Sequence, residues 1–308
     1  MKLPFRLVYH DGYDPHFGDH VFPSQKYRLI KNRMMLSGFA EEEDFRKPGP
    51  ATREQLLEAH TPQWVKKLET DTLTYHDILK LEVPYSRKMV EAARLAAGGT
   101  LLAARWALHQ GVGYNIGGGF HHAFPDHGEG FCAVNDVAVA ARALQKEGVL
   151  KKVLIVDCDV HQGNGTASIF AGDRRVFTLS IHHFNNYPTE KPPSTVDIHL
   201  PDGVPDAEYL AHLAPAYETA VLGFRPEIVF FVAGTDPYFD DQLGGLSLTK
   251  EGMYLRDRLV FDVALRKHIP VVSVLAGGYA KKIDDTVDLH IQTARAATDS
   301  MTEWARRW

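Results

Sequence analysis

The sequence predicts an α/β protein with three layers, α/β/α, built around a mostly parallel sheet. Apolar runs rich in β-branched residues recur along the chain, and most are nearly continuous, as in parallel strands that are covered on both faces. Stretches with helical periodicity lie between these runs, so strand and helix alternate. No repeat or linker-like change in composition interrupts this pattern, and we therefore expect residues 1–308 to form a single domain.

The individual elements follow from local signals. The expected strands, in chain order, are RLVY (6–9), GYNI (113–116), KVLIV (152–156), VFTLSI (176–181), EIVFFVAG (227–234) and PVVSVLAG (270–277). The stretch 86–108 is long and amphipathic, which predicts a helix. A second helix is expected over 134–148, where Gly148 suits a C-cap, and a third over 249–268, which begins with Thr249 as a start signal.

Composition and charge limit the classes of partner. The formal net charge is -5 and the pI is near 6.3, and the basic residues are dispersed, which argues against direct nucleic-acid binding. No signal peptide is apparent, and no apolar run is long enough to span a bilayer, so we expect a cytoplasmic protein. Cys132 and Cys158 are too few for a disulfide framework and are expected to be reduced and buried.

Polar residues that could take part in catalysis or ligand binding follow the ends of the expected strands. Asp157, Asp159 and His161 follow the run that ends at position 156. Asp236 and Tyr279 follow the two later runs in the same way. Because ligands of open α/β sheets bind outside the carboxyl ends of the strands, these residues are predicted to meet at one edge of the sheet.

The segment VDCDVHQGNG (156–165) indicates a metal site. If the strand continues through it, the period of two places Asp157, Asp159 and His161 on the same side. Such a group is costly to bury without a cation or hydrogen-bond partners. Together with Asp236, the residues Asp159 and His161 would give a divalent ion three ligands and leave one position open, as in catalytic sites. The alternative is a buried aspartate satisfied by backbone amides.

Tandem histidines follow the glycines of GGGFHH (117–122). Imidazole titrates in the range required of a base that deprotonates water and of an acid that protonates a leaving group, so His121 and His122 are candidates for both tasks. Asp157 and Asn164 are candidate partners that fix their tautomers, and the carboxylate partner would make one imidazole more basic than the other. The alternative is a histidine pair in a surface loop with no role.

Tyr279 completes the predicted site. It follows Gly277 and Gly278, whose missing side chains let the backbone turn tightly beside a ligand. A phenol at this position could donate a hydrogen bond to a carbonyl oxygen as negative charge develops on it. Without the metal site, the same segment would be a strand-end turn with an interfacial tyrosine.

The chain resembles the histone deacetylase family, which has the arginase–deacetylase fold. The matching segments occur in the family's order over roughly residues 110 to 280, and HTPQW (60–64) extends them toward the N-terminus. They are GGGFHHAFPDHGEGFCAVND, VDCDVHQGNG, TLSIHH, AGTDPYFDDQLGGLSLTKEG and LAGGY. The segments GGGFHH, HQGNG and QLGGLS are most similar to the class four branch and its bacterial relatives.

The resemblance implies a catalytic centre. It implies one zinc ion, which Fe²⁺ or Co²⁺ could replace, held by Asp159, His161 and Asp236. It also implies His121 and His122 as the catalytic pair, with His122 as the general base and His121 as an electrostatic and orienting partner. It implies Asp157 as the partner of His121 and Asn164 as the partner of His122. Tyr279 is the residue implied to polarise the carbonyl.

The resemblance further implies a substrate channel and a structural potassium ion. The channel residues are Gly130, Phe131, Leu243 and Gly278. The potassium ligands, several through backbone carbonyls, are Asp157, Asp159, His161, Ser180 and Ile181. Asn164 stands where the class one branch has aspartate, so that branch's proton transfers do not carry over. The loop 182–195 has no counterpart, and its Asn185 and Tyr187 are candidates for the second channel wall.

The predicted activity is that of a zinc-dependent amidohydrolase that removes acetyl or longer acyl groups from N-ε-acyl-lysine of a protein or peptide. A metal-activated water would attack the amide carbonyl. Acetylpolyamines or other small acyl-amides are alternative substrates, and a catalytically silent acyl-lysine-binding protein is an alternative function. A binuclear manganese ureohydrolase is disfavoured because Val160, Gln162 and Gly163 around His161 supply no bridging carboxylates. Acyl-chain length and oligomeric state stay open.

Overall fold

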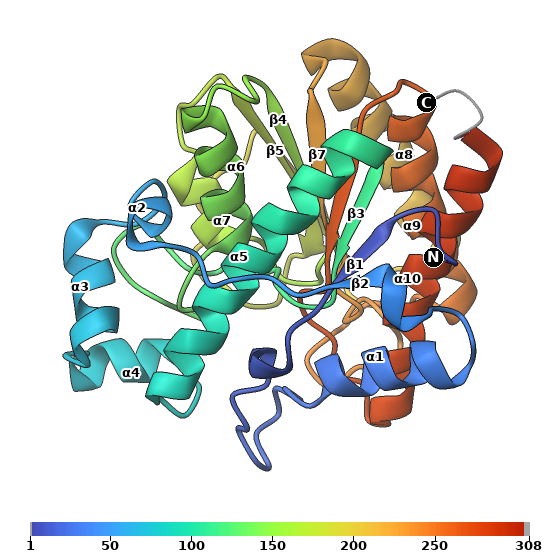
Figure 1. Ribbon diagram of the computed structural model, residues 1–308. Coiled ribbons are helices and arrows are strands. Elements are labelled where there is room, and N and C mark those ends of the chain that lie inside the picture. Colours follow the sequence, from blue (N-terminus) through green and yellow to red (C-terminus); the bar gives the residue numbers. More distant parts are fainter. Residues whose placement is uncertain (1, 305–308) are drawn as a thin grey trace.

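The computed structural model describes residues 2–304 and is organised around one eight-stranded sheet (Figure 1). All neighbouring strands are parallel, in the order β2-β1-β3-β8-β7-β4-β5-β6. The strands are β1 (Arg6–Val8), β2 (Phe45–Arg46), β3 (Val112–Asn115), β4 (Val153–Asp157), β5 (Val176–His183), β6 (Val196–Leu200), β7 (Ile228–Val232) and β8 (Val271–Val274).

Helices cover both faces of this sheet, which confirms the predicted three-layer architecture (Figure 1). One buried apolar cluster includes residues of the helices α2 (Arg53–Leu56), α3 (Pro62–Thr70), α4 (Tyr75–Leu81), α5 (Arg87–Gln110) and α6 (Asp136–Lys146), with the end of α7 (Asn164–Ile169) packed on it. The other includes residues of α1 (Lys26–Leu36), α8 (Asp206–Phe224), α9 (Lys250–Leu265) and α10 (Ile283–Trp304). Two short 3-10 helices are η1 (Asp11–Tyr13) and η2 (Glu42–Asp44).

The three predicted helices begin at the polar residues that cap them. Ser86, Asn135 and Thr249 each accept, through the side chain, a hydrogen bond from the backbone N–H three residues later. Gly148 follows α6 with a φ of 74°, a left-handed conformation that glycine adopts at little cost. Local capping chemistry therefore sets the start of these helices close to the predicted positions.

The strand predictions need one correction that matters for the site. β4 ends at Asp157, so Asp159 and His161 lie in the loop beyond it and not on a continuing strand. The expected alternation of side chains does not apply there, and the backbone of the loop instead turns Asp159 and His161 toward the end of β7. The sequence patterns also did not predict the edge strand β6, whose residues are largely half-exposed, or the long helices α8 and α10.

The order of the central strands brings the polar residues together. In the registered pairs, Asp157 at the end of β4 lies beside Val232 of β7 and Ser180 of β5, and Val232 lies beside Val274 of β8. The segments that follow β3, β8, β7, β4 and β5 therefore emerge next to one another. Parallel strands place all their carboxyl ends at the same edge, and the five segments converge on one site there.

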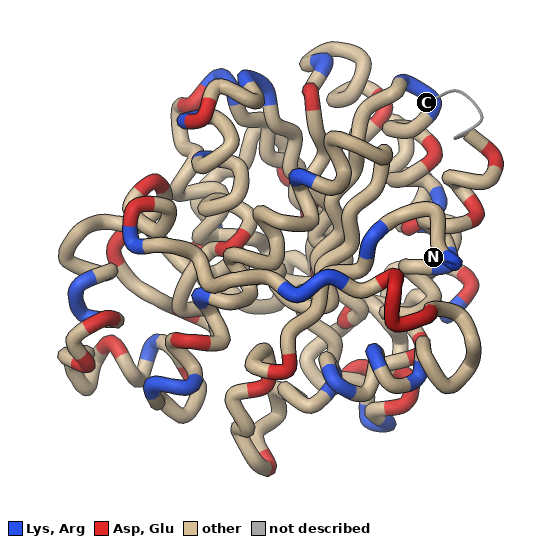
Figure 2. Tube along the Cα trace, viewed as in Figure 1, with Lys and Arg blue, Asp and Glu red and all other residues tan. Residues whose placement is uncertain are grey.

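Charged residues are spread over the surface with both signs intermixed, and few lie on the central strands (Figure 2). The dispersion of Lys and Arg in the fold agrees with the dispersion along the sequence. Both cysteines, Cys132 and Cys158, are buried and unpaired by disulfides. Across residues 2–304, no helix combines the length and the apolar character needed to cross a membrane.

Candidate active site

Asp159, His161 and Asp236 form a buried cluster with the geometry of a metal centre. Each offers one ligand atom, and these atoms lie within 4.8 Å of one another. His161 Nδ1 lies 3.0 Å from Asp159 Oδ1 and 3.4 Å from Asp236 Oδ2. Within residues 2–304 this is the one group of three or more such side chains that could hold an ion. The loops after β4 and β7 thus supply the three groups that the sequence predicts as ligands.

The surroundings of the cluster fit a cation. Backbone N–H groups satisfy part of each carboxylate, as Gly277 N donates to Asp159 Oδ2 at 2.8 Å and Val160 N donates to Asp236 Oδ1 at 2.8 Å. Asp236 Oδ2 is buried and accepts no hydrogen bond from the described part of the chain. A Cβ atom at Gly277 would lie 1.9 Å from this oxygen, so only glycine leaves room beside it. Buried carboxylate oxygens normally accept a hydrogen bond, so one without a donor, beside space left open by a glycine, is expected to bind a positive ion.

The electrostatics of the cluster favour positive charge. Burial by itself would lower the pKa of His161, but the nearby carboxylates of Asp159 and Asp236 raise it to about 10. Burial and the neighbouring Asp159 carboxylate raise the pKa of Asp236. Two carboxylates and one imidazole in a dry site are strained unless they share a cation, and their oxygen and nitrogen donors suit zinc, iron or cobalt.

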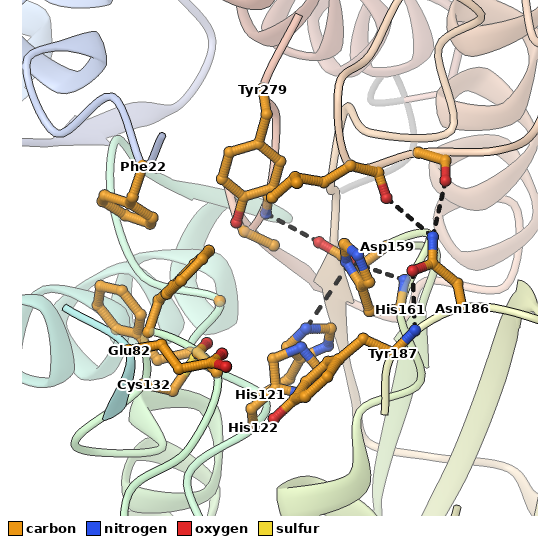
Figure 3. A pocket seen from close by; sticks show the side chains of 18 of the residues that line it. Phe22, Glu82, His121, His122, Cys132, Asp159, His161, Asn186, Tyr187 and Tyr279 are labelled. Atoms are coloured by element: carbon orange, nitrogen blue, oxygen red, sulfur yellow. Dashed lines mark hydrogen bonds and ion pairs between the residues drawn. The ribbon is translucent and has the colours of Figure 1, made fainter. Parts of the chain in front are cut away.

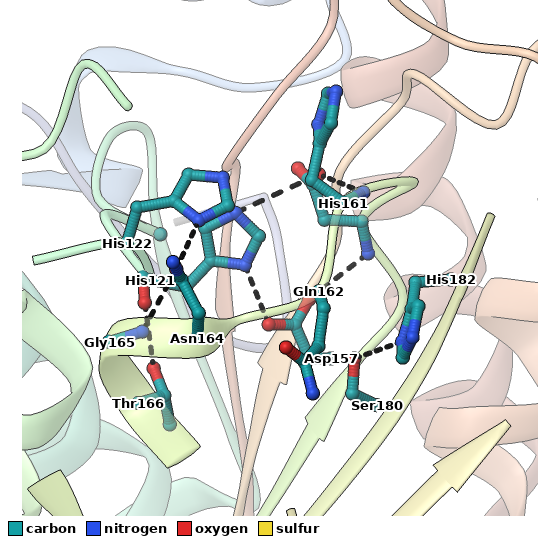
Figure 4. A network of polar contacts seen from close by, with 12 residues as sticks. His121, His122, Asp157, His161, Gln162, Asn164, Gly165, Thr166, Ser180 and His182 are labelled. Carbon is teal, nitrogen blue, oxygen red and sulfur yellow. Dashed lines mark hydrogen bonds and ion pairs between the residues drawn. The ribbon is translucent and has the colours of Figure 1, made fainter. Parts of the chain in front are cut away.

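The tandem histidines lie side by side against this cluster (Figure 4). The ring centroids of His121 and His122 are 4.0 Å apart, and His121 Nε2 lies 3.8 Å from Asp159 Oδ1. His121 Nδ1 is 2.6 Å from Asp157 Oδ2, and His122 Nδ1 is 2.7 Å from Asn164 Oδ1. These are the two hydrogen-bond partners that the sequence predicts. The catalytic roles assigned to them stay predictions.

The two histidines have opposite electrostatic environments. Burial would lower the pKa of His121, but the Asp157 and Asp159 carboxylates outweigh burial and raise that pKa to about 9. Burial and the positive charges of His121 and His161 lower the pKa of His122 well below its ordinary value. Near neutral pH, His121 is therefore a positively charged imidazolium, and His122 is a neutral imidazole.

Tyr279 forms part of the wall opposite the histidines (Figure 3). Its ring packs against Phe22 and Phe131, with centroids 6.3 and 6.0 Å away. Burial, together with the Asp159 and Asp236 charges, raises the pKa of its phenol well above the ordinary value. The hydroxyl is therefore a permanent hydrogen-bond donor, as the predicted role requires.

Two residues that support Tyr279 were not predicted from the sequence. Asp241 accepts hydrogen bonds from Tyr279 N at 2.6 Å and from Leu243 N at 2.9 Å, which ties two walls of the site together. The buried Lys26 donates to Ala276 O at 2.6 Å, with its Nζ 5.8 Å from the Tyr279 ring. Burial lowers the pKa of Lys26 to about 8, although nearby carboxylates raise it. Lys26 is distant in sequence and carried no local signal, whereas Asp241 belongs to a recognised segment.

A cavity of about 470 Å³ leads from the surface to the cluster (Figure 3). Its walls include the predicted channel residues Gly130, Phe131 and Leu243, and both candidates from the 182–195 loop, Asn185 and Tyr187. Gly277 lines the cavity, whereas Gly278 packs behind the wall, where a Cβ atom would lie 2.2 Å from Thr235 Oγ1. The channel assignment of Gly278 thus moves to its neighbour.

Phe131 is held in a costly conformation at this wall. Its φ is 70°, a left-handed value that is uncommon for a bulky residue. The hydrogen bonds from Gly130 N to Lys80 O at 3.1 Å and from Phe131 N to Leu81 O at 2.9 Å fix the segment against the end of α4. Opposite it, the Tyr187 ring lies 4.9 Å from the His122 ring. Aromatic side chains therefore border the approach to the histidines.

The residues of the expected potassium site also lie together. Asp157 at the end of β4 is the registered partner of Ser180 in β5, and Ile181 follows directly. Asp159 and His161 follow Asp157 in the adjoining loop. The ligation of a monovalent ion by this group stays a prediction.

Fold and site together define a class of protein: a parallel α/β/α fold with a buried Asp-His-Asp cluster at the carboxyl edge of its sheet. The structure is similar to the crystal structure of the HDA15 HD domain, with a TM-score of 0.77 over 98% of this chain and 94% of that chain at 24% identity. That likeness shows that this chain has the same fold as the HDA15 HD domain.

The family model of the histone deacetylase domain matches residues 20–294, and the chain belongs to this family. It is 31% identical to histone deacetylase 2 of Arabidopsis thaliana over 98% of this chain and 79% of that protein. It is 41% identical to an uncharacterized protein of Picosynechococcus over 96% of this chain and 99% of that protein. The protein is therefore a hydrolase that acts on amides, such as the amide of an acylated lysine.

Proposed function

We propose that the protein removes acyl groups from the Nε atom of acylated lysine side chains in a zinc-dependent hydrolysis. The observation that carries this proposal is the buried pair His121 and His122, which lie beside the Asp-His-Asp cluster with pKa values shifted in opposite directions. General acid–base catalysis of amide hydrolysis requires a group that accepts a proton from water and a group that donates one to the leaving nitrogen.

The chain's residues divide the chemistry among them. A divalent ion held by Asp159, His161 and Asp236 would polarise the amide carbonyl and make water beside it easier to deprotonate. His122, whose imidazole is neutral, accepts a proton from the water whose oxygen bonds to the carbonyl carbon. Tyr279 donates a hydrogen bond to the carbonyl oxygen as negative charge develops there.

The second half of the reaction breaks the carbon–nitrogen bond. The proton taken by His122 passes to the departing lysine nitrogen, which gives a carboxylic acid and the lysine amine. The acid then gives its remaining proton to the amine, and the products leave as a carboxylate and a lysine ammonium group. The charge of Asp157 outweighs burial and raises the pKa of His121, which favours the imidazolium form that offsets negative charge in the site. Asp157 keeps the His121 ring in place through the 2.6 Å hydrogen bond to Nδ1.

The cavity supports a substrate with an apolar stem. Phe131, Leu243 and Tyr187 border the approach, and the residues that line the cavity also include Asp159, His161 and both catalytic histidines. The methylene chain of lysine fits such walls, and its amide would then reach the polar end of the cavity. Acetyl and longer acyl groups are both included in the proposal, and a small acyl-amide such as an acetylpolyamine is the competing substrate class.

A substrate panel tests the proposal. Zinc-loaded protein is assayed on one peptide carrying a lysine acylated with chains of increasing length, and in parallel on an acetylpolyamine. We expect turnover of at least one acyl-lysine peptide, which chelation abolishes and zinc restores. Folded, zinc-loaded protein that binds these peptides without hydrolysing any would contradict the proposal and indicate a silent binding protein. Turnover of the polyamine alone would reject lysine as the substrate.

A further inference from the structure

Asn164, the hydrogen-bond partner of His122, is itself hydrogen-bonded to Glu129, which is the central residue of a further group of hydrogen bonds. Its Oε1 accepts a hydrogen bond from Asn164 Nδ2 at 2.7 Å and another from the Tyr187 hydroxyl at 2.8 Å. Its Oε2 lies 3.4 Å from His127 Nε2. One carboxylate therefore contacts both the partner of His122 and the aromatic wall of the cavity.

The contact with Glu129 determines which way the Asn164 amide points. An ionised carboxylate can only accept hydrogen bonds, so it selects the NH₂ end of the amide. Asn164 Oδ1 then points the other way, where it lies 2.7 Å from His122 Nδ1 and accepts a hydrogen bond from Gly165 N at 3.0 Å. Because an oxygen acceptor requires a donor, His122 Nδ1 carries the hydrogen and its Nε2 presents a lone pair.

Glu129 is itself held firmly. Its backbone exchanges two hydrogen bonds with Cys132, at 3.0 and 2.9 Å. Burial would raise the pKa of its carboxyl group, but hydrogen bonds from His127, Tyr187 and Asn164 outweigh burial and lower that pKa. The group is thus ionised near neutral pH and acts as an acceptor to each of its neighbours.

The contrast with the other histidine shows why such a residue is needed. His121 is paired directly with the Asp157 carboxylate, whose two oxygens are both acceptors and need no orientation. His122 is paired with an amide, which presents an acceptor in one orientation and a donor in the other. A flipped Asn164 would offer its NH₂ group to Nδ1 and favour the tautomer with the hydrogen on Nε2, which cannot act as a base.

We infer that Glu129 is a positioning residue that orients the Asn164 amide, so that His122 is kept in the tautomer with an unprotonated Nε2. The same carboxylate fixes the Tyr187 hydroxyl, which couples the wall of the cavity to the base. This inference rests on the proposed function only for its kinetic consequence, because the tautomer of His122 can be observed without turnover.

The first measurement is spectroscopic and uses the full chain without added metal. Two-bond ¹H–¹⁵N correlation spectra of protein labelled at histidine report which ring nitrogen of His122 carries the hydrogen, with His122→Ala to assign the signal. We expect the Nδ1–H form in the wild type, a population of the Nε2–H form in Glu129→Ala, and recovery of the Nδ1–H form in Glu129→Gln. Glutamine restores an acceptor oxygen toward Asn164 without the charge.

The second measurement is a double-mutant cycle on the zinc-loaded enzyme. We expect Glu129→Ala to lower kcat about tenfold, the size seen when a partner of a catalytic ligand is removed, with a smaller effect on KM. In an Asn164→Asp background there is no amide to orient, so the same Glu129→Ala change should cost no activity. Glu147→Ala, which removes a surface carboxylate bonded to Arg105, is the control and should leave kcat unchanged.

The outcomes distinguish the positioning role of Glu129 from the proposed hydrolysis of acyl-lysine. An unchanged His122 tautomer in folded Glu129→Ala protein overturns the inference, as does an equal loss of kcat in both backgrounds, which would show a merely structural role. A shifted tautomer in a protein whose wild type hydrolyses no acyl-lysine peptide supports the positioning role and rejects the proposed function. Circular dichroism and thermal unfolding confirm that each variant compared is folded.

Discussion

Tyr279→Phe is the most informative single substitution, because it removes one hydroxyl and keeps the ring. The ring is buried between Phe22 and Phe131 and near the Lys26 ammonium, so phenylalanine can occupy the same space. What is lost is one preorganised donor to the developing oxyanion. Removing such a donor costs about 10²–10³-fold in kcat, or about 3–4 kcal/mol in the activation free energy.

The assay is steady-state hydrolysis of a fluorogenic acetyl-lysine peptide by zinc-loaded protein. We expect kcat to fall by about two to three orders of magnitude with little change in KM, since the donor acts mainly in the transition state. The free energy of unfolding should change by no more than about 1 kcal/mol. Tyr217→Phe is the matched control, because it removes a buried hydroxyl that donates to Val260 O at 3.2 Å, far from the site in the α8–α9 packing.

Two results would refute this reasoning. A Tyr279→Phe variant with kcat within about threefold of the wild type would show that the phenol stabilises no oxyanion. A large fall in kcat for Tyr217→Phe as well would show that any lost tyrosine hydroxyl disturbs the enzyme. The expected control result is unchanged kcat with a free energy of unfolding lowered by about 1 kcal/mol.

The remaining predictions concern the base, the cluster and pH. His122→Ala should lower kcat by about 10²–10⁴-fold while zinc content by metal analysis stays the same; lost zinc would instead indicate a ligand. Asp236→Asn should bind less than one equivalent of zinc, and full occupancy would exclude Asp236 as a ligand. Burial lowers the pKa of His60 from 6.5 to about 4, so the unfolded chain binds the proton more tightly. The contribution of His60 to the free energy of unfolding is therefore constant above about pH 6.5 and should fall by about 3 kcal/mol as pH decreases to 4. In urea titrations, His60→Gln should reduce the loss of stability over this pH range, and an unaltered profile would contradict the prediction.

The structural basis of the His60 prediction is a neutral ring with two fixed partners. Its Nδ1 lies 2.9 Å from Phe124 O and donates to it, and its Nε2 accepts a hydrogen bond from Asn135 N at 3.0 Å. A proton on Nε2 would face the Asn135 N–H, so the folded state resists protonation. The ring thereby joins the loop that carries the catalytic histidines to the start of α6.

Much of the site was predictable because its chemistry follows strand ends. Apolar runs reveal the buried strands, and the topology of a parallel sheet then brings Asp159, Asp236 and Tyr279 together without any knowledge of contacts. Residue chemistry named Asp157 and Asn164 as candidate partners of the histidines, and the family resemblance implied the pairing of His121 with Asp157. The reasoning about alternation was wrong, since β4 ends at Asp157, yet the loop places Asp159 and His161 at the same edge.

What could not be predicted depends on distant segments and on backbone geometry. Lys26 reaches the Tyr279 loop from the other end of the chain, so no local pattern marks it. Glu129 lies inside a recognised segment, but its contact with Asn164 requires α7 to pack beside that segment, and its contact with Tyr187 requires the 182–195 loop to fold toward the site. The placement of Gly278 behind the wall, one residue from the cavity, depends on the exact turn after β8.

Zinc titration of chelated wild-type protein, followed by deacetylation of an acetyl-lysine peptide, tests the central claim most directly. A single Asp-His-Asp cluster within residues 2–304 predicts that activity is absent without metal and is fully restored by one equivalent per chain. Activity that persists after complete chelation, or that requires two equivalents, would contradict a mononuclear hydrolytic centre at Asp159, His161 and Asp236.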